Sequence, residues 1–442
     1  MTTILQNSPS ATFTLDHVFK FPQIFTANPD NVRHILKTHF DNYPKGNFFI
    51  STVFDFLGNG IFSVDGESWK FQRQVSSHAF NTKSLRKFVE TVVDTELHDR
   101  LIPILSDSDK TVLDFQDVLQ RFAFDNVCNI AFGFDPACLL PSLPETEFAV
   151  AFEEATNLSS ERFRSVWWRW KIFRFFNVGW EKSLKIAVSK VHGFAKKIVR
   201  EKKQELAENS CLESPDLLSR FLSSGHSDED FVMDIVISFI LAGRDTTSAA
   251  LTWFFWLLHK HPEVENEILK EIKEKSDMPV FEEVKDMIYT HASLCESMRL
   301  YPPVPADNKQ AINDDVWPDG TVVKKGTVIT YHPYAMGRME KIWGSDWAEF
   351  KPERWLKRDE EGKWSFVGRD SYSYPVFQAG PRICLGKDMA FLQMKRVVAG
   401  VLRRFKVVPA VEDGSEPVLI AYLTTKMKDG FPVRIEERGK LD

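Results

Sequence analysis

One stretch constrains this chain more than any other: residues 375–390, Pro-Val-Phe-Gln-Ala-Gly-Pro-Arg-Ile-Cys-Leu-Gly-Lys-Asp-Met-Ala. It places Cys384 in a loop directly before a helix-like run that extends over 387–405. A thiolate at a helix N-terminus faces unpaired backbone N–H groups and the positive end of the helix dipole, and both lower its pKa. Gly380 and Gly386 carry no side chains, so a large flat ligand can approach the backbone closely.

The spacing of this stretch distinguishes Cys384 from an ordinary cysteine. A lone cysteine is more often a small buried hydrophobe than a ligand. Here Phe377, Gly380, Arg382, Cys384 and Gly386 fix five positions in ten, and a chance match in the chain is on the order of one in 10⁴. Arg382 can meet an anionic edge of the ligand, and Phe377 can shield the sulfur from water. The pattern resembles the haem-thiolate signature of cytochromes P450, in which the cysteine is the proximal iron ligand.

Length and composition set broader limits. With 442 residues the chain exceeds the usual size of one domain, and length alone suggests two or three. Its net charge of −6 argues against nucleic acid as a partner. The five cysteines are odd in number and form no C-x-x-C pair, which disfavours a disulfide framework or a zinc site built on them. No window reaches about 18 uncharged apolar residues, so no membrane-spanning helix is predicted.

A second motif consists of Trp69 and Arg73. Positions i and i+4 share a helix face, so the indole N–H and the guanidinium can point at the same anion. Alone the pair is weak, because a surface cation beside a packed tryptophan is the commoner arrangement. In company with Cys384 it resembles the family's clamp on the haem propionates.

A third motif, Ala-Gly-Arg-Asp-Thr-Thr at 242–247, interrupts a long apolar helix. This helix is expected to begin with a capping box at Ser227 and Asp230 and to end near residue 259. Charges and hydroxyls inside an apolar helix are costly unless they are used. Gly243 leaves room for a flat ligand against the helix, and the Thr246 hydroxyl can bond a carbonyl one turn back and open the helix. A satisfied, bent core helix is the alternative. The segment resembles the family's oxygen-activation segment, whose acid–threonine pair, here Asp245 and Thr246, delivers protons.

A fourth motif is Glu296-x-x-Arg299, followed by Arg354. A buried carboxylate between two guanidinium groups makes a charge-assisted lock, whereas an isolated E-x-x-R is nearly meaningless because surface pairs of this kind are common. In this order, Glu296, Arg299 and Arg354 resemble the structural triad of the cytochromes P450.

Periodicity and turn signals predict a mainly α chain with a small β part. The expected elements are a strand pair (Phe13 to Phe19 and Phe21 to Ala27), a helix capped by Asn28, a loop over 43–62, helices through most of 83–208 and over 262–275 and 281–300, strands within 322–331, and a hairpin of 418–426 with 431–435 turning at Asp429-Gly430.

Residues 161–182 combine eight aromatic residues with six lysines and arginines. Aromatic rings with interleaved cations favour a lipid headgroup interface. A loop that lines a channel with its rings turned inward is an equally weighted alternative.

The motifs stand in the order of the cytochrome P450 family, and the resemblance extends from about Thr12 onward. It implies one catalytic domain over 1–442, despite the estimate from length, with the mainly α fold of the family. It also implies haem b as cofactor, with O₂ and with NADPH acting through a cytochrome P450 reductase. Cys384 would ligate the iron, and Trp69, Arg73 and Arg382 would hold the propionates.

A closer resemblance is to the plant fatty-acid hydroxylase branch, carried by 69–80, 242–247, 334–338, 378–382 and 387–391. It implies hydroxylation of a fatty acid at or near its ω end. A sister group hydroxylates jasmonoyl-amino-acid conjugates, and the motifs do not separate the two. A haem-thiolate isomerase or lyase for fatty-acid hydroperoxides is a further alternative, disfavoured by Asp245 and Thr246. A haem-binding but inactive truncated product is another.

Relatives in this branch carry an N-terminal membrane anchor that the short polar start of this chain does not resemble. We therefore expect either a truncated product or a membrane contact that rests on 161–182, at the cytosolic face of the endoplasmic reticulum as in the family. For the reductase, the basic residues Lys83, Lys87 and Lys395 are expected to contribute to a docking patch on the thiolate side.

Overall fold

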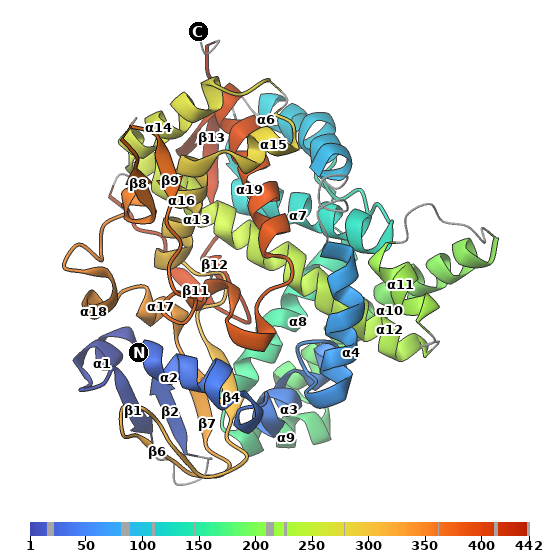
Figure 1. Cartoon of the computed structure of the whole chain (residues 1–442). Helices are drawn as coiled ribbons and strands as arrows, with labels where there is room; N and C mark the ends of the chain where they lie inside the picture. The colour runs from blue at the N-terminus through green and yellow to red at the C-terminus, as the bar shows by residue number, and fades with distance from the viewer. Residues whose placement is uncertain are drawn as a thin grey trace.

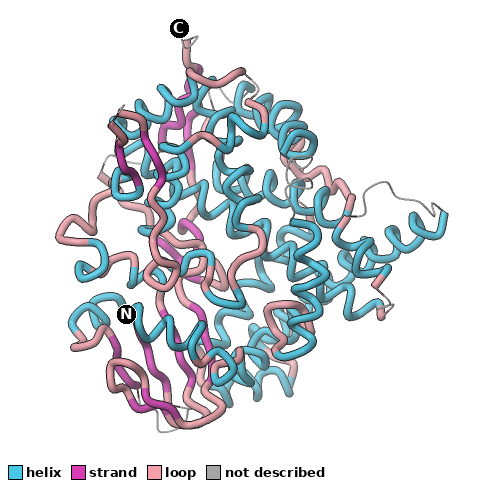
Figure 2. Tube along the Cα trace, viewed as in Figure 1, coloured by secondary structure: helices cyan, strands magenta, loops and turns pink. Residues whose placement is uncertain are grey.

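The computed structural model describes residues 1–15, 22–80, 89–107, 111–144, 146–208, 216–224, 228–277, 279–360, 362–410 and 414–439. Helices form most of the molecule, and short strands gather along one side of it (Figures 1 and 2). The predicted mainly α architecture with a small β part is confirmed.

The main sheet lies near the N-terminus (Figure 1) and has the order β1-β2-β7-β4, formed by Thr12–Leu15, Gln23–Thr26, Val328–Tyr331 and Asp307–Gln310. The predicted strand pair is confirmed, with Phe13 opposite Phe25 and their ring centroids 5.1 Å apart. Phe19 and Phe21 lie outside the described residues. β7 joins this pair in parallel to β2, so the sheet combines two distant parts of the sequence.

The helix predicted after Asn28 is also confirmed. α2 (Pro29–Arg33) begins with the Asn28 side chain accepting a hydrogen bond from the Asp30 N–H, 2.9 Å away. It continues as one π-helical turn, η1 (His34–Thr38).

The loop predicted over 43–62 is wrong in its middle, where α3 (Gly46–Leu57) forms. Its buried residues Val53, Phe56 and Leu57 follow the helical period. Gly46 and Gly58 have φ of +72° and +48° and mark the two ends of the helix rather than breaking it.

The helical layer contains α4 (Gly66–Ser77), α7 (Phe115–Phe132), α8 (Glu147–Arg164), α10 (Gly179–Glu208) and the continuous segment α12 (Glu229–Ile240), η6 (Leu241–Asp245) and α13 (Thr246–Lys260). The apolar side of α10 is buried, largely against α8. α12 is capped by Asp228, whose side chain accepts from the Asp230 N–H, while Ser227 lies outside the described residues.

In the C-terminal half, the helix predicted over 281–300 is divided into α15 (Phe281–Lys285) and α16 (Ile288–Leu300). The predicted hairpin of 418–426 with 431–435 is wrong. β11 (Leu419–Ala421) pairs with β12 (Thr425–Met427), and β13 (Pro432–Glu437) pairs instead with β10 (Phe405–Pro409) and β3 (Leu113–Asp114). The turn at Asp429 and Gly430, both with positive φ, therefore connects two sheets.

The remaining elements are α1 (Thr2–Asn7), η2 (Phe40–Asn42), η3 (His78–Phe80), η4 (Val89–Val93), η5 (Glu96–Leu101), α6 (Ile102–Asp107), α9 (Trp167–Phe176), α11 (Leu217–Ser223), α14 (Pro262–Lys273), β5 (Asp315–Val316), β6 (Val322–Val323), α17 (Pro333–Met336), α18 (Glu340–Trp343), η7 (Pro352–Trp355), β8 (Leu356–Arg358), β9 (Trp364–Phe366), η8 (Pro375–Phe377), η9 (Gly380–Arg382) and α19 (Lys387–Arg404). Among the helices of the described residues, none is both long and apolar enough to cross a membrane.

Candidate active site

Cys384 lies in the loop between η9 and α19, close to the N-terminus of α19 as the sequence predicts. Its backbone N–H donates to the carbonyl of Phe377 at 2.8 Å, which closes the loop. Cys384 is exposed, whereas Cys128, Cys138 and Cys295 are buried. Burial by surrounding atoms still raises the pKa of the Cys384 thiol, against the opposing effects of the Gly386 N–H and nearby cations. Cys384 is therefore accessible to a ligand, although surrounding atoms desolvate its thiol.

The glycines of the loop have structural roles. Gly380 has φ of +64°, and a Cβ there would lie 2.0 Å from the carbonyl oxygen of Leu36 in η1. Gly380 is therefore required by the close approach of the loop to η1, and its role of admitting a flat ligand stays a prediction. At Gly386 a Cβ would lie 3.9 Å from the Cys384 sulfur, an ordinary contact. Phe377 packs against Phe391 of α19, with ring centroids 5.2 Å apart.

Trp69, Arg73 and Arg382 come together as predicted. The guanidinium carbon of Arg382 lies 4.6 Å from the centre of the Trp69 ring, and that of Arg73 lies 5.9 Å from it. Arg382 donates to the Val64 carbonyl at 2.9 Å and to Asp65 at 2.6 Å, but its Nε is buried without a partner. Desolvation lowers the pKa of Arg73, and the charge of Cys384 acts in the opposite direction. Within the described ranges, no carboxylate pairs with Arg73.

The structure adds a buried charged cluster that the sequence analysis missed. Lys45 pairs with Asp307 at 2.7 Å, and Asp307 also accepts from Tyr331 at 2.9 Å. Lys309 is 1% exposed and its Nζ is buried without a partner. Desolvation and the charge of Lys45 lower the pKa of Lys309 to about 7, and Arg382 contributes in the same direction. In the sequence, Asp307 and Lys309 follow an ordinary strand alternation, so only the fold shows that their side of β4 is buried.

These cations test whether haem fits the site. Its propionates are carboxylates, which need donors at the edge of the pocket. Arg382 and Lys309 each have a buried nitrogen without a partner, and Arg73 is electrostatically coupled to Cys384. Unsatisfied buried donors are costly unless a ligand completes them. The residues therefore fit a dicarboxylate macrocycle whose metal Cys384 would ligate.

The helix with the third motif departs from α-helical geometry where the sequence predicts a local opening. The Thr246 hydroxyl donates to the Ala242 carbonyl at 2.6 Å, and the segment Leu241–Asp245 is π-helical. A Cβ at Gly243 would lie 2.6 Å from the Val127 side chain, and the predicted place of Gly243 against a flat ligand stays a prediction. Its lack of a side chain permits close packing of this turn on α7.

Asp245 and Thr246 have separate environments. Asp245 is 3% exposed and accepts from the Arg244 guanidinium at 3.2 Å. No hydrogen bond joins the Asp245 and Thr246 side chains in the part of the chain that the structure describes. The pair is adjacent in sequence, but any proton transfer between the two side chains requires a bridging molecule or a change of rotamer.

One face of this helix is accessible. From Val232 to Leu258 every residue is buried except Phe239, Ala242, Gly243 and Thr246. Their spacing puts them on one side of the helix. This accessible face is apolar apart from the Thr246 hydroxyl.

The fourth motif forms a buried lock. Glu296 and Arg299 are each 0% exposed and make two parallel hydrogen bonds of 2.8 Å. Arg354 Nε donates to Glu296 at 3.1 Å, and the Trp355 indole N–H donates to it at 2.9 Å. Arg299 also donates to the backbone carbonyls of Trp347 and Glu349, so the lock holds α16, η7 and the segment before it together.

Replacing Thr246 with alanine is expected to leave haem and substrate binding intact but to lower the ratio of product to NADPH consumed about tenfold. A tenfold change corresponds to ~1.4 kcal/mol, which one hydrogen bond can supply. The measurement is product, peroxide and NADPH in the same reaction. Thr247→Ala is the neighbouring control, because Thr247 is buried. An unchanged ratio in Thr246→Ala would remove Thr246 from the mechanism.

Comparison with known proteins points to the same protein family as the residues of this site. The family model of cytochrome P450 matches residues 4–429. The chain is 65% identical over 439 residues to cytochrome P450 94A1 of Vicia sativa, covering 98% of this chain and 85% of that protein. It is 66% identical over 444 residues to cytochrome P450 94A2 of the same plant (99% and 86%) and 50% identical over 449 residues to cytochrome P450 94B1 of Arabidopsis thaliana (100% and 87%).

A match of this extent shows the family of the chain. The exposed loop cysteine and the buried Glu296–Arg299 pair agree with it. The chain belongs to the cytochrome P450 family of monooxygenases.

Proposed function

We propose that this monooxygenase hydroxylates the alkyl chain of a fatty acid at or near its ω end, using O₂ and electrons from NADPH through a reductase. The observation that carries the proposal is the accessible face formed by Phe239, Ala242, Gly243 and Thr246, which offers an alkyl chain an apolar wall beside a single hydroxyl. C–H bonds have nothing to hydrogen-bond, so the position attacked is chosen by the shape of such a wall. The motif resemblance to plant fatty-acid hydroxylases points to the same substrate class.

The residues have distinct roles in this proposal. Cys384 would ligate the haem iron, and Arg73, Arg382 and Lys309 would hold the propionates. The bound haem supplies oxygen activation, favoured by thiolate ligation. Thr246 would hold a proton-donating hydroxyl next to the substrate, in the opened turn that its bond to Ala242 stabilises. Asp245, oriented by Arg244, would serve as the proton reservoir behind it.

A cavity of about 520 Å³ lies at the start of α12, lined by Asp65, Asp228, Asp230 and Asp234 among others. Burial raises the pKa of Asp234 to about 6. Because this cavity is acidic, it repels a carboxylate at neutral pH. It therefore does not suit the head group of a fatty acid.

The test is product analysis with haem-loaded protein, purified reductase and NADPH, using lauric acid and jasmonoyl-isoleucine in parallel. We expect hydroxylaurate with its hydroxyl at or near the terminal carbon. If only jasmonoyl-isoleucine were hydroxylated, the substrate would be the conjugate and not the fatty acid. Conversion of a fatty-acid hydroperoxide without NADPH, with no hydroxylation of either acid, would identify an isomerase or lyase instead.

We also propose that the chain contacts a membrane surface, at the cytosolic face of the endoplasmic reticulum as in the family. α9 exposes Trp167 and Trp168 at 46% and 48%, and Phe175 and Phe176 at 83% and 66%. Rings turned outward beside cations support a headgroup interface over a channel lining. Trp170 differs, because it is 3% exposed and packs under the Arg162 guanidinium at 4.6 Å.

Changing Trp167, Trp168, Phe175 and Phe176 together to serine is expected to weaken binding to anionic liposomes at least tenfold, since each exposed ring contributes buried apolar area at the interface. Co-sedimentation with vesicles measures it. Val112→Ser with Val418→Ser is the control, because both valines are more than half exposed, at 52% and 57%. Unchanged liposome binding together with a collapse of laurate affinity would make α9 a channel wall.

The basic patch expected for the reductase needs correction. Lys395 is 4% exposed and donates to the carbonyls of Val284 and Lys285, at 3.2 and 2.9 Å. Desolvation lowers its pKa to about 8. Lys395 therefore ties α19 to α15 and cannot dock a partner. Lys83 and Lys87 lie outside the described residues, and their role in docking stays a prediction.

Lys395→Glu is now expected to destabilise the fold rather than to weaken reductase docking, because it buries a carboxylate against two carbonyl oxygens. A loss of several kcal/mol is the scale for an unpaired buried charge, and denaturant unfolding measures it. Lys395→Met, which keeps the apolar stem, is expected to be milder. Normal stability of Lys395→Glu combined with a raised KM for the reductase would restore the docking role.

A further inference from the structure

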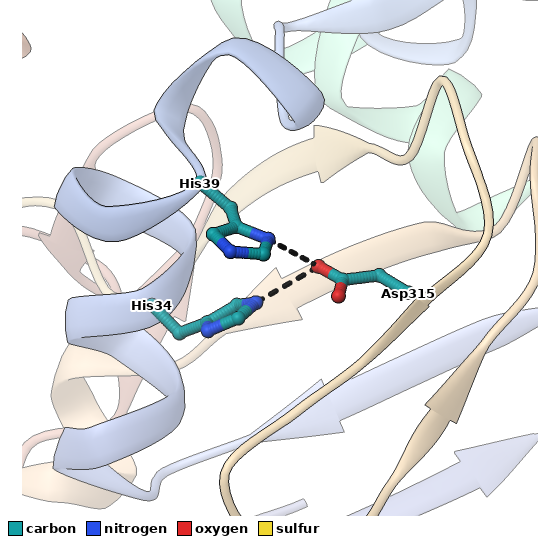
Figure 3. Close-up of side chains that lie close together, drawn as sticks. All are labelled: His34, His39 and Asp315. Carbon is teal, nitrogen blue, oxygen red and sulfur yellow. Dashed lines mark hydrogen bonds and ion pairs between the residues drawn. The ribbon is translucent and has the colours of Figure 1, made fainter.

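A cluster of two histidines and one aspartate includes none of the residues described for the cysteine site. His34 and His39 bracket η1, and Asp315 lies on β5. His34 Nε2 is 2.8 Å and His39 Nδ1 is 3.1 Å from the same oxygen, Oδ2 of Asp315 (Figure 3). Three ligand-type atoms from two distant parts of the chain thus meet within 4.8 Å of one another.

The π-helical turn brings the two imidazoles together. Residues five apart on an α-helix point about 140° away from each other. Here the His39 N–H donates to the His34 carbonyl at 2.8 Å, an i→i+5 bond, and the two side chains lie on the same face. Their ring centroids are 4.1 Å apart, and both rings point toward Asp315 (Figure 3). π-turns are rare and are often found at functional sites.

We propose that His34, His39 and Asp315 bind a divalent transition metal ion of the zinc type. Two imidazole nitrogens and a carboxylate oxygen are ligands that Zn²⁺ takes at about 2.0–2.2 Å, in a tetrahedron with ligand atoms roughly 3.3 Å apart. The observed separations of 2.8 and 3.1 Å from Asp315 require an opening of only a few tenths of an ångström. In the alternative arrangement the two imidazoles only form hydrogen bonds with Asp315 and bind no metal ion. Zn²⁺ titration distinguishes the two arrangements.

Hydrogen bonds from neighbouring residues orient the Asp315 carboxylate. The Tyr43 hydroxyl donates to Asp315 Oδ2 at 2.6 Å and receives the Trp317 indole N–H at 2.9 Å. The other oxygen, Oδ1, accepts the Val316 N–H at 2.8 Å. Such outer partners orient a metal-binding carboxylate. The His34 and Asp315 side chains are each 10% exposed, whereas that of His39 is 46% exposed, so the site is open on one side for entry of the ion and for a water ligand.

A metal ion here would join η1 to the hairpin of β5 and β6. η1 also supports the cysteine loop, because the Leu36 carbonyl lies against Gly380. Occupancy is therefore expected to raise the thermal stability of the haem-loaded protein, with no change in the ligation of the iron.

The experiment titrates Zn²⁺ into haem-loaded protein from which free metal has been removed by chelation, so that Cys384 is already ligated. We expect one equivalent to bind, an increase in Tm, and an X-ray absorption spectrum at the zinc edge with two imidazoles and bond lengths of about 2.0–2.1 Å. Mg²⁺ is expected to give no such shift, because it prefers oxygen ligands.

The variants His34→Ala and His39→Ala are each expected to weaken Zn²⁺ binding at least tenfold and to remove the rise in Tm. His39 is exposed, so its variant is expected to fold, which the haem spectrum checks. His261→Ala is the matched control, since His261 Nδ1 also lies 2.9 Å from a carboxylate, Glu263, but belongs to none of the three-ligand clusters found among the described residues. Equal Zn²⁺ affinity in wild type and His39→Ala, sulfur ligands in the spectrum, or no binding at tenfold excess of Zn²⁺ would overturn the proposal.

Discussion

Replacing Cys384 with alanine is expected to abolish the red-shifted Soret band of the reduced carbonyl complex and all NADPH-dependent hydroxylation. The band depends on thiolate ligation, and the thiolate favours O–O cleavage. Cys384 is the one exposed cysteine among those described, in a loop closed by its own hydrogen bond to the Phe377 carbonyl. The measurements are the difference spectrum of the reduced protein with carbon monoxide and product formation from laurate.

Cys295→Ala provides the matched control. Cys295 is buried in the core, and its hydrogen bond from Tyr374 is accepted by the backbone carbonyl, so the substitution removes only a small apolar side chain. It is expected to lower stability modestly and to keep the red-shifted band. If Cys384→Ala kept both the band and activity, the assignment of this loop as the haem-ligating site would fail.

Replacing Glu296 with alanine is expected to cost about 3–5 kcal/mol of the free energy of unfolding, because it leaves buried guanidinium groups without their carboxylate. Arg299 and Arg354 both donate to Glu296, and Arg299 is 0% exposed. Denaturant unfolding measures the loss, and much of the variant is expected to be recovered without haem because η7 and the segment before it are released.

The chain contains its own control for this prediction. Glu161 and Arg164 repeat the E-x-x-R pattern and are 2.6 Å apart, but their side chains are 42% and 49% exposed. Glu161→Ala is therefore expected to cost under ~1 kcal/mol. If both variants lost a similar free energy of unfolding, burial would not decide how much the ion pair contributes to stability, and the prediction would be wrong.

Several parts of the site were predictable from local spacing in the sequence. Cys384 before a helix, Trp69 and Arg73 one turn apart, and the Thr246 bond to Ala242 all depend on contacts within a few residues, which follow directly from helix geometry. The strand pair of Phe13 with Phe25 was predictable for the same reason. In each case the interacting groups are close in the chain.

Features that depend on burial or on a distant partner could be seen only in the folded chain. Three lysines show this. Lys37 is exposed to solvent, and Lys395 donates to backbone carbonyls. Lys309 is buried without a partner, and the charge of Arg382 acts on it. β13 pairs with β10 rather than with the nearby β12.

The roles of the glycines and the histidine cluster belong to this second group. Gly380 is required by Leu36 and Gly243 by Val127, and His34 meets Asp315 across a separation of 281 residues. A sequence pattern records which groups can interact, but the free energy of burying a charge or joining two backbones depends on neighbours that only the folded chain brings together.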